Sequence, residues 1–212
     1  MRTTKITSGE YYHIFNRGNN KTPIFLDEKD YIRFLFLILY FQSPLIFENI
    51  GRHVAHFVRN RAFNIGEDNE EKVLRNRFVG LASFALIPNH LHLAVREQKE
   101  NGISRYMQRV LCSYTKYFNA RHQKVGHLFQ GPYQAVHVVD NTQFLHLSAY
   151  IHRNARELRG WKNAEHTYPW SSYQDYVKEN RWGLFLKKDM IAKQFSSGKE
   201  YKHFVDTSGT KE

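Results

Sequence analysis

The chain has 212 residues, of which 42% are hydrophobic and 15% aromatic, so it can bury one sizeable core and is not expected to be disordered. Its formal net charge of +11 predicts a polyanionic partner, although a basic surface that merely keeps the protein soluble would give the same balance. One cysteine excludes intrachain disulfides, no apolar run approaches the ~20 residues that span a bilayer, and the polar first ten residues contain no signal peptide, so we expect a cytoplasmic protein without membrane contact.

The first 80 residues predict one strand, one strong helix and a less regular stretch. Residues 10–16 alternate aromatic and polar side chains and predict a strand, which a turn-prone segment ends. Asp27 stands at an N-cap position, and apolar residues recur at helical spacing from 28 to about 42. We expect residues 45–77 to be an insertion, with a short helix near 50–58 and then a polar, exposed connection over 64–76.

Two apolar strands follow, at 78–87 and 90–96, and we expect them to pair antiparallel across a two-residue break. Side chains alternate along a strand, so His90 and His92 share one face while the leucines and the valine between and after them take the other. Two neutral imidazoles side by side can form half of a metal site. Such pairs are more often polar residues on a hydrogen-bonded face, so both interpretations stay open until a third ligand is found.

From Gly102, apolar residues at helical spacing predict a second amphipathic helix of about 18 residues. A row of cations interleaved with aromatic rings could neutralise phosphates and stack bases. A solvated helix face has the same composition, and the two interpretations carry equal weight. The basic residues on this face are Arg105, Arg109, Lys116 and Arg121.

A strand over 134–139 and a third helix from 143 to about 158 complete the regular pattern, and Asp140 can help cap the helix. Residues one turn apart stack above one another on a helix, so Tyr150 can present a hydroxyl beside a carbonyl oxygen of Asn154. We expect the aromatic segment 161–176 to pack on the body and residues after about 201 to be mobile. One stripe of the third helix carries His146, Tyr150, Asn154 and Glu157.

Five motifs occur in the order found in single-tyrosine HUH transposases, the IS200-like transposases. The arrangement is most similar to the REP-associated tyrosine transposases, and it covers about residues 10–176. The motifs are YHIFNRG at 12–18, IPNHLH at 87–92, GHLFQG at 126–131, YIHRN at 150–154 and PWSSY at 169–173.

The resemblance implies an α+β fold, in which helices cover a ferredoxin-like antiparallel sheet. It also implies a transposase that cleaves and rejoins single-stranded DNA at or near hairpins. We expect a single domain over 1–212, with its core at about 10–176, the insertion at about 45–77 and a peripheral C-terminal segment at about 177–212. Relatives include dimers and monomers, so a homodimer stays open.

The resemblance also implies roles for individual residues. Tyr150 matches the family nucleophile, which forms a 5′-phosphotyrosine and releases a 3′-hydroxyl. His90, His92 and Asn154 match the positions that hold a divalent metal, Mg²⁺ or Mn²⁺. We expect the DNA to be contacted by six basic residues: Arg17, Arg105, Arg109, Lys116, Arg121 and Arg153.

Two departures from the family pattern leave alternatives open. Relatives carry an arginine and then a lysine around a loop tyrosine, where this chain has Pro132 and Gln134, and Ala155 replaces a common proline. The protein could therefore be a domesticated, non-catalytic nucleic-acid-binding protein, or a metal-dependent nuclease without a covalent intermediate. With 13 tyrosines, only the spacing to Asn154 and the resemblance select the nucleophile. His146 is either a base for it or an ordinary surface histidine.

Overall fold

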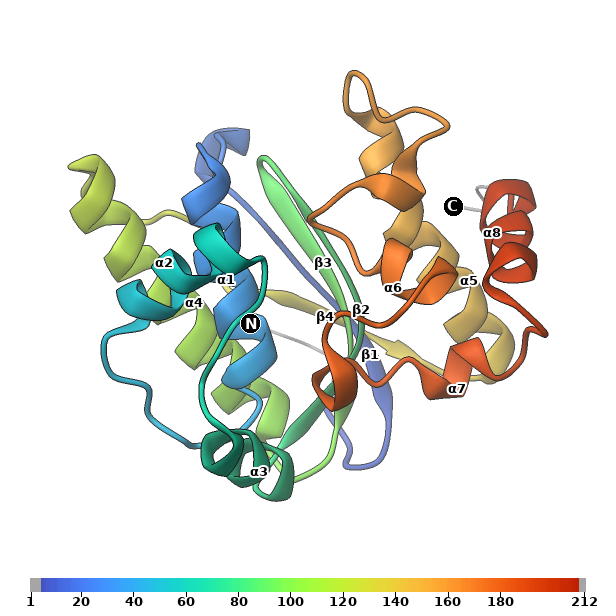
Figure 1. Ribbon diagram of the computed structural model, residues 1–212, viewed down its shortest axis with the longest axis horizontal. Helices are drawn as coiled ribbons and strands as arrows, with labels where there is room; N and C mark the ends of the chain where they lie inside the picture. The colour runs from blue at the N-terminus through green and yellow to red at the C-terminus, as the bar shows by residue number, and fades with distance from the viewer. Residues whose placement is uncertain (1–4, 210–212) are drawn as a thin grey trace.

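The protein is built on a four-stranded antiparallel sheet with helices on both faces, as the computed structural model shows for residues 5–209 (Figure 1). The strand order is β2-β3-β1-β4, which is the ferredoxin-like arrangement. The predicted α+β class and antiparallel sheet are confirmed. The strands are β1 (Tyr11–Arg17), β2 (Val79–Ile87), β3 (His90–Glu97) and β4 (Gln134–Val138).

One face of the sheet carries the main apolar core. Leu91, Leu93 and Val95 of β3 are fully buried in it, as the alternation along this strand predicts. The first helix begins where expected, because the Asp27 carboxylate accepts a hydrogen bond from the Asp30 backbone N–H. The helices on this side are α1 (Glu28–Tyr40), α2 (Ile50–Asn60), α3 (Glu67–Arg75) and α4 (Gly102–His122) (Figure 1).

The polar stretch after α2 is not the exposed connection expected over 64–76. It forms α3, whose Val73 is fully buried. Acidic residues fill the first turn of this helix, and Lys72 and Arg75 occupy its last turn, which is the distribution that the helix dipole favours. The helix contributes one fully buried side chain to the core, so its sequence lacks a broad apolar stripe. Apolar periodicity therefore could not predict α3.

The other face of the sheet is covered by a second set of helices. Small side chains, Ala82, Ala85 and Ala94, pack there against Ile151 and Ala155. The longest of these helices passes into a 3-10 turn at Asn154–Glu157. The helices on this side are α5 (Asn141–Arg153), α6 (Tyr173–Val177), α7 (Asp189–Ala192) and α8 (Gly198–Thr207) (Figure 1).

The C-terminal segment is more deeply packed than the peripheral, partly mobile segment we expected. Tyr201 and Val205 of α8 are buried beside α5, and Phe185 and Leu186 belong to the core on the opposite side of the sheet. Residues four apart share one face of a helix, so a short helix with two apolar residues at this spacing can dock. The last three residues of the expected mobile tail lie outside the described residues.

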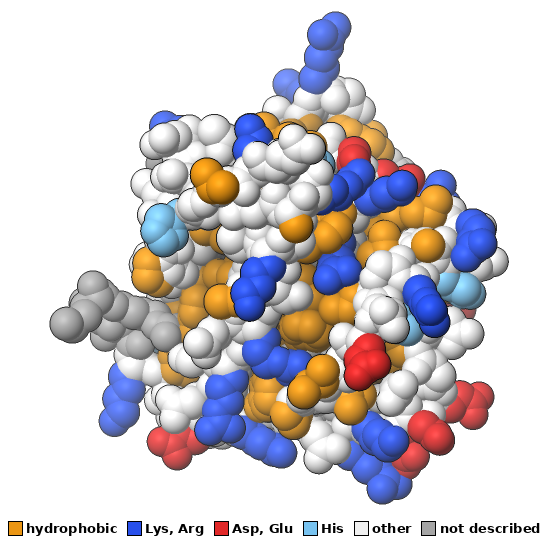
Figure 2. Space-filling model, turned by 90° about the vertical axis from the view of Figure 1, so that its left-hand side faces the viewer, with side chains coloured by type: hydrophobic (Ala, Val, Ile, Leu, Met, Phe, Trp, Pro, Cys, Tyr) orange, Lys and Arg blue, Asp and Glu red, His pale blue; other side chains and the backbone are white. Residues whose placement is uncertain are grey.

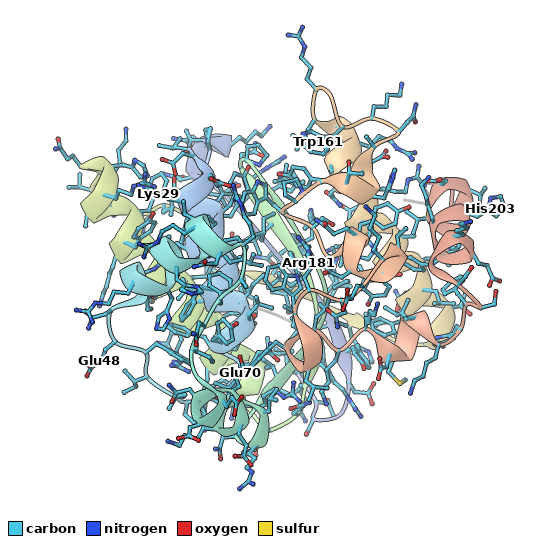
Figure 3. All side chains as sticks on the ribbon, in the orientation of Figure 1. Lys29, Glu48, Glu70, Trp161, Arg181 and His203 are labelled. Atoms are coloured by element: carbon cyan, nitrogen blue, oxygen red, sulfur yellow. The ribbon has the colours of Figure 1, made fainter. Side chains whose placement is uncertain are left out.

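Residues after α5, from Trp170 to Lys187, cover the β2 edge of the sheet. The backbone N–H of Leu86 donates to the Trp170 carbonyl (2.9 Å), and the N–H of Lys187 donates to the Leu81 carbonyl (2.8 Å). Arg181, labelled near the centre of Figure 3, lies between the two helical layers and pairs with the buried Asp175 at 2.8 Å. The edge is thereby closed to further strand pairing.

Three strands bring functional residues to the same end of the sheet. The antiparallel register places Arg17, the last residue of β1, opposite His90, the first residue of β3. The first residue of β4, Gln134, pairs with Phe15. The predicted site residues on strands therefore gather at this end, beside the C-terminal turn of α5.

Candidate active site

A cavity of about 640 Å³ opens at this end of the sheet, and we call it the strand-end cavity. It contains all four residues that the sequence assigned to chemistry: His90, His92, Tyr150 and Asn154. The structure thus brings together residues from the middle of the chain and from its later third, within one subunit. The remaining lining residues are Phe15, Asn16, Arg17, Gln130, Gly131, Pro132, Gln134 and Glu157.

His90 is held in one tautomer by its neighbour. Its Nδ1 lies 2.7 Å from Oδ1 of Asn89. The Asn89 amide is oriented by its Nδ2 group, which donates to the Lys21 carbonyl (3.1 Å). An amide oxygen can only accept, so Nδ1 of His90 carries the proton and Nε2 keeps its lone pair.

Asn154 points its amide oxygen at that lone pair. Its Nδ2 group donates to the Tyr150 carbonyl (2.8 Å), which leaves Oδ1 facing His90 Nε2 at 3.4 Å. With Nε2 unprotonated, both atoms are acceptors, and no proton lies between them. Two ligands of an octahedral Mg²⁺, each about 2.1 Å from the ion, lie about 3 Å apart. The spacing and chemistry of this pair therefore fit a bound cation.

His92 completes a donor set of two imidazoles and one amide. Its ring is nearly perpendicular to that of His90, at 84° with centroids 5.1 Å apart, and only 7% of the residue is exposed. Burial lowers the pKa of both imidazoles below the usual value, and the Arg17 charge adds to the effect. Both rings are therefore neutral near pH 7, the state that can bind a metal.

The donor set depends on the amide of Asn154. Among residues 5–209, no group of three or more His, Cys, Asp or Glu side chains is arranged to hold a metal. Nitrogen and oxygen donors of this kind suit Mn²⁺ better than Mg²⁺, which prefers oxygen alone.

Tyr150 is the tyrosine that lines the strand-end cavity beside this set. It is 49% exposed, and its ring meets the His92 ring edge-on at 5.3 Å. Burial and the nearby Glu157 carboxylate raise its pKa, so the phenol is protonated at neutral pH. Tyr150 lines the strand-end cavity and is half-exposed, so a substrate that enters the cavity can contact it.

Two of the six predicted DNA-contacting cations lie near Tyr150. Arg17 lines the strand-end cavity. Arg153 lines a neighbouring groove of about 590 Å³ along α5, which also includes Tyr150 and Asn154. His146, considered as a base, lies in this groove and not in the strand-end cavity.

The four basic residues of α4 lie on the other side of the sheet. Arg109 hydrogen-bonds to the carbonyls of Ser43 and Leu45, and Arg121 pairs with Asp27 at 2.6 Å and Asp30 at 2.7 Å. Figure 2 shows this side, where Lys and Arg side chains surround a hollow lined by hydrophobic ones. The exposed residues of the four are Arg105, Lys116 and Arg121.

Two residues that touch the metal-binding candidates were not singled out in the sequence. One is Asn89, which directly precedes His90, and the other is His13 on β1, whose Nε2 lies 2.8 Å from Nδ1 of His92. Alternation along β1 could have placed His13 on one face. Its proximity to His92 depends on the register between β1 and β3, which the sequence analysis did not derive.

Comparisons with known proteins agree with the motifs. Residues 54–154 match the family described as "Transposase IS200 like", a segment that includes β2, β3, α4, β4 and α5 and ends at Asn154. Over this segment the chain is similar to the IS200-like transposases. The matched segment supplies both histidines, the tyrosine and the amide of the strand-end cavity.

A solved structure extends the likeness to nearly the whole fold. It is a REP-associated tyrosine transposase bound to a REP hairpin, with 15% sequence identity and a TM-score of 0.54. The match covers 93% of this chain and 96% of the other. At this identity the likeness shows the fold alone. None of the curated proteins matches the chain, and no helix within residues 5–209 is long and apolar enough to cross a membrane.

Proposed function

We propose that this protein cuts and rejoins single-stranded DNA at or near hairpins, with Tyr150 as the nucleophile. The main support is that two acceptor atoms, His90 Nε2 and Asn154 Oδ1, face each other in the same cavity as the half-exposed Tyr150. The family match supports the reaction class. The hairpin in the solved relative and the +11 net charge support a nucleic-acid substrate of this kind.

His90, His92 and Asn154 would hold one divalent ion, Mn²⁺ or Mg²⁺. When bound, such an ion withdraws charge from the scissile phosphate and orients it for in-line attack. Arg17 lies in the same cavity and would neutralise an adjacent phosphate. Nδ1 of each imidazole lies within hydrogen-bond distance of another side chain, that of His90 beside Asn89 and that of His92 beside His13, and these contacts orient the two rings.

Tyr150 would attack the phosphorus through its hydroxyl oxygen. The bond from phosphorus to the 3′-oxygen breaks, the 3′-hydroxyl leaves with a proton from solvent, and the tyrosine becomes a 5′-phosphotyrosine. Because burial and Glu157 raise the pKa of Tyr150, its proton must be removed during the attack, and the half-exposed side chain allows water to take it. The new linkage retains the bond energy, so a 3′-hydroxyl can reverse the step and rejoin a strand.

The test is incubation of labelled hairpin-bearing single strands with the protein and Mn²⁺. We expect a covalent protein–DNA adduct that Tyr150→Phe abolishes and that removal of the metal by a chelator prevents. Tyr11→Phe is the control, because this half-buried tyrosine of β1 lies outside the strand-end cavity. Binding without cleavage would favour the non-catalytic alternative. Cleavage that survives Tyr150→Phe would favour a nuclease that uses water.

A further inference from the structure

His13 lies behind the proposed metal site and not in the strand-end cavity. In the antiparallel register, Phe15 of β1 stands opposite His92 of β3, and His13 stands opposite Ala94. His13 and His92 are therefore diagonal neighbours on one face of the sheet, close enough for their rings to touch. The rings stack at 24° with centroids 5.1 Å apart, and His13 Nε2 lies 2.8 Å from His92 Nδ1.

We propose that His13 is a positioning residue that holds His92 in the tautomer able to bind a divalent metal ion. A nitrogen–nitrogen contact of 2.8 Å needs one N–H and one lone pair. If His13 accepts, Nδ1 of His92 carries the single proton of the neutral ring, and Nε2 is free for the metal. If His13 donated instead, the proton of His92 would sit on Nε2 and would block the ligand position.

The neighbouring ligand supports this direction of the hydrogen bond. Asn89 holds His90 with its proton on Nδ1, because an amide oxygen can only accept. His13 occupies the equivalent place for His92, at the Nδ1 end of the ring. Metal-binding histidines almost always donate their other N–H to such a partner, and loss of the partner costs about 10–100-fold in metal affinity.

The surroundings of His13 determine which substitutions are informative. Its ring also contacts Phe15, with centroids 4.9 Å apart, and meets Tyr150 edge-on at 5.7 Å. His13→Phe keeps a ring among these rings but removes the acceptor. His13→Gln loses the ring but returns an amide oxygen within reach of His92 Nδ1. A purely packing role would favour the phenylalanine, whereas a positioning role favours the glutamine.

The experiment measures Mn²⁺ affinity of the full-length protein by calorimetry without DNA, and the tautomer of His92 by ¹⁵N NMR without metal. The effect of His13 on metal binding rests on the proposed function, whereas the tautomer of His92 can be tested without it. We expect His13→Phe to weaken Mn²⁺ binding about 10–100-fold and His13→Gln to restore it to within about threefold of wild type. His137→Phe is the matched control on β4, where His137 pairs with Glu10 outside the cavity.

The outcomes separate the two proposals. Wild-type affinity in His13→Phe, or a wild-type protein in which His92 carries its proton on Nε2, overturns the role of His13. Absence of Mn²⁺ binding by the wild-type protein overturns the metal site of the proposed function, while the NMR measurement still decides the tautomer. If His13→Phe fails to fold, the wild-type tautomer and the affinity of His13→Gln give the answer.

Discussion

The two faces of the sheet are formed by alternate residues of the same strands, but they carry different side chains. Leu91, Leu93 and Val95 of β3 face α1 and α4 and are fully buried among apolar residues. His90 and His92 face the α5 side, where a cavity replaces close packing at the end of the sheet. Most of the apolar burial energy comes from the first face, so substitutions on the second can change chemistry while the fold is retained.

Each face also contains a buried polar cluster, and the two clusters differ in how completely they are paired. On the α1–α4 side, the buried Asp30 carboxylate accepts from Arg121 (2.7 Å), Tyr117 (3.1 Å) and the Leu26 backbone (2.9 Å). On the α5 side, two acceptor atoms face each other with no donor between them. A fully paired cluster stabilises the fold, whereas facing lone pairs indicate a place for a cation.

The largest effect is expected from His92→Ala. The rate of adduct formation should fall by at least about 10³-fold. The bound metal would stabilise the transition state by several kcal/mol, and each 1.4 kcal/mol lost slows the reaction about tenfold. The free energy of unfolding should change much less in His92→Ala than in Leu93→Ala, which alters the neighbouring residue on the opposite face. Leu93→Ala should destabilise by about 2–5 kcal/mol while the folded fraction still forms the adduct. Cleavage assays and urea unfolding measure both effects, and an active His92→Ala variant would remove the metal site from the mechanism.

Asp30→Ala should cost about 3 kcal/mol of unfolding free energy, at the lower end of the range for breaking a buried ion pair. We expect the lower end of this range because Arg121 is partly exposed and its side chain can turn to solvent. Asp30→Asn keeps part of the hydrogen bonding and should lose less. Adduct formation by either variant at low temperature should match wild type, because Asp30 lies on the side away from the cavity. A variant that is stable but inactive would contradict the separation of the two clusters.

Local signals in the sequence predicted much of the fold. The caps of α1 and α5 are the predicted Asp27 and Asp140, since each carboxylate accepts from a backbone N–H three residues later. The pairing of β2 with β3 and the shared face of the two histidines also follow from local alternation. These features depend on residues close together in the chain, which a single sequence displays directly.

Features that depend on distant contacts were missed. The helix α8 docks through Tyr201 and Val205, and their burial depends on α5 and α6, which lie far from them in the sequence. The partnership of His13 with His92 joins residues 79 positions apart and requires the strand order. The four residues predicted to carry the chemistry share a cavity, but only the structure shows the hydrogen bonds that fix which of their atoms face one another.

Asn154→Ala should weaken Mn²⁺ binding at least about tenfold, which is the smallest loss expected for a mere partner of a metal ligand, because one of three protein donors is removed. Asn141→Ala is the matched control on the same helix, since Asn141 lies in the first turn of α5 and pairs with Gln194 at the surface. Calorimetry without DNA measures the affinity. Equal affinities of the two variants would show that the amide facing His90 is not a ligand.

The smallest effects are expected from substitutions of the basic residues. They test whether DNA contacts both sides of the sheet. Arg17→Gln should lower the slope of log affinity against log salt by about 0.7 for a short single strand, because one phosphate contact in the cavity is lost. Lys116→Gln, on α4, should leave that slope unchanged. If the stem of a hairpin lies along α4, Lys116→Gln will lower the slope for a hairpin substrate only. An equal loss on both substrates would mean that the single strand itself contacts the α4 side, and the cavity alone would then not account for DNA binding.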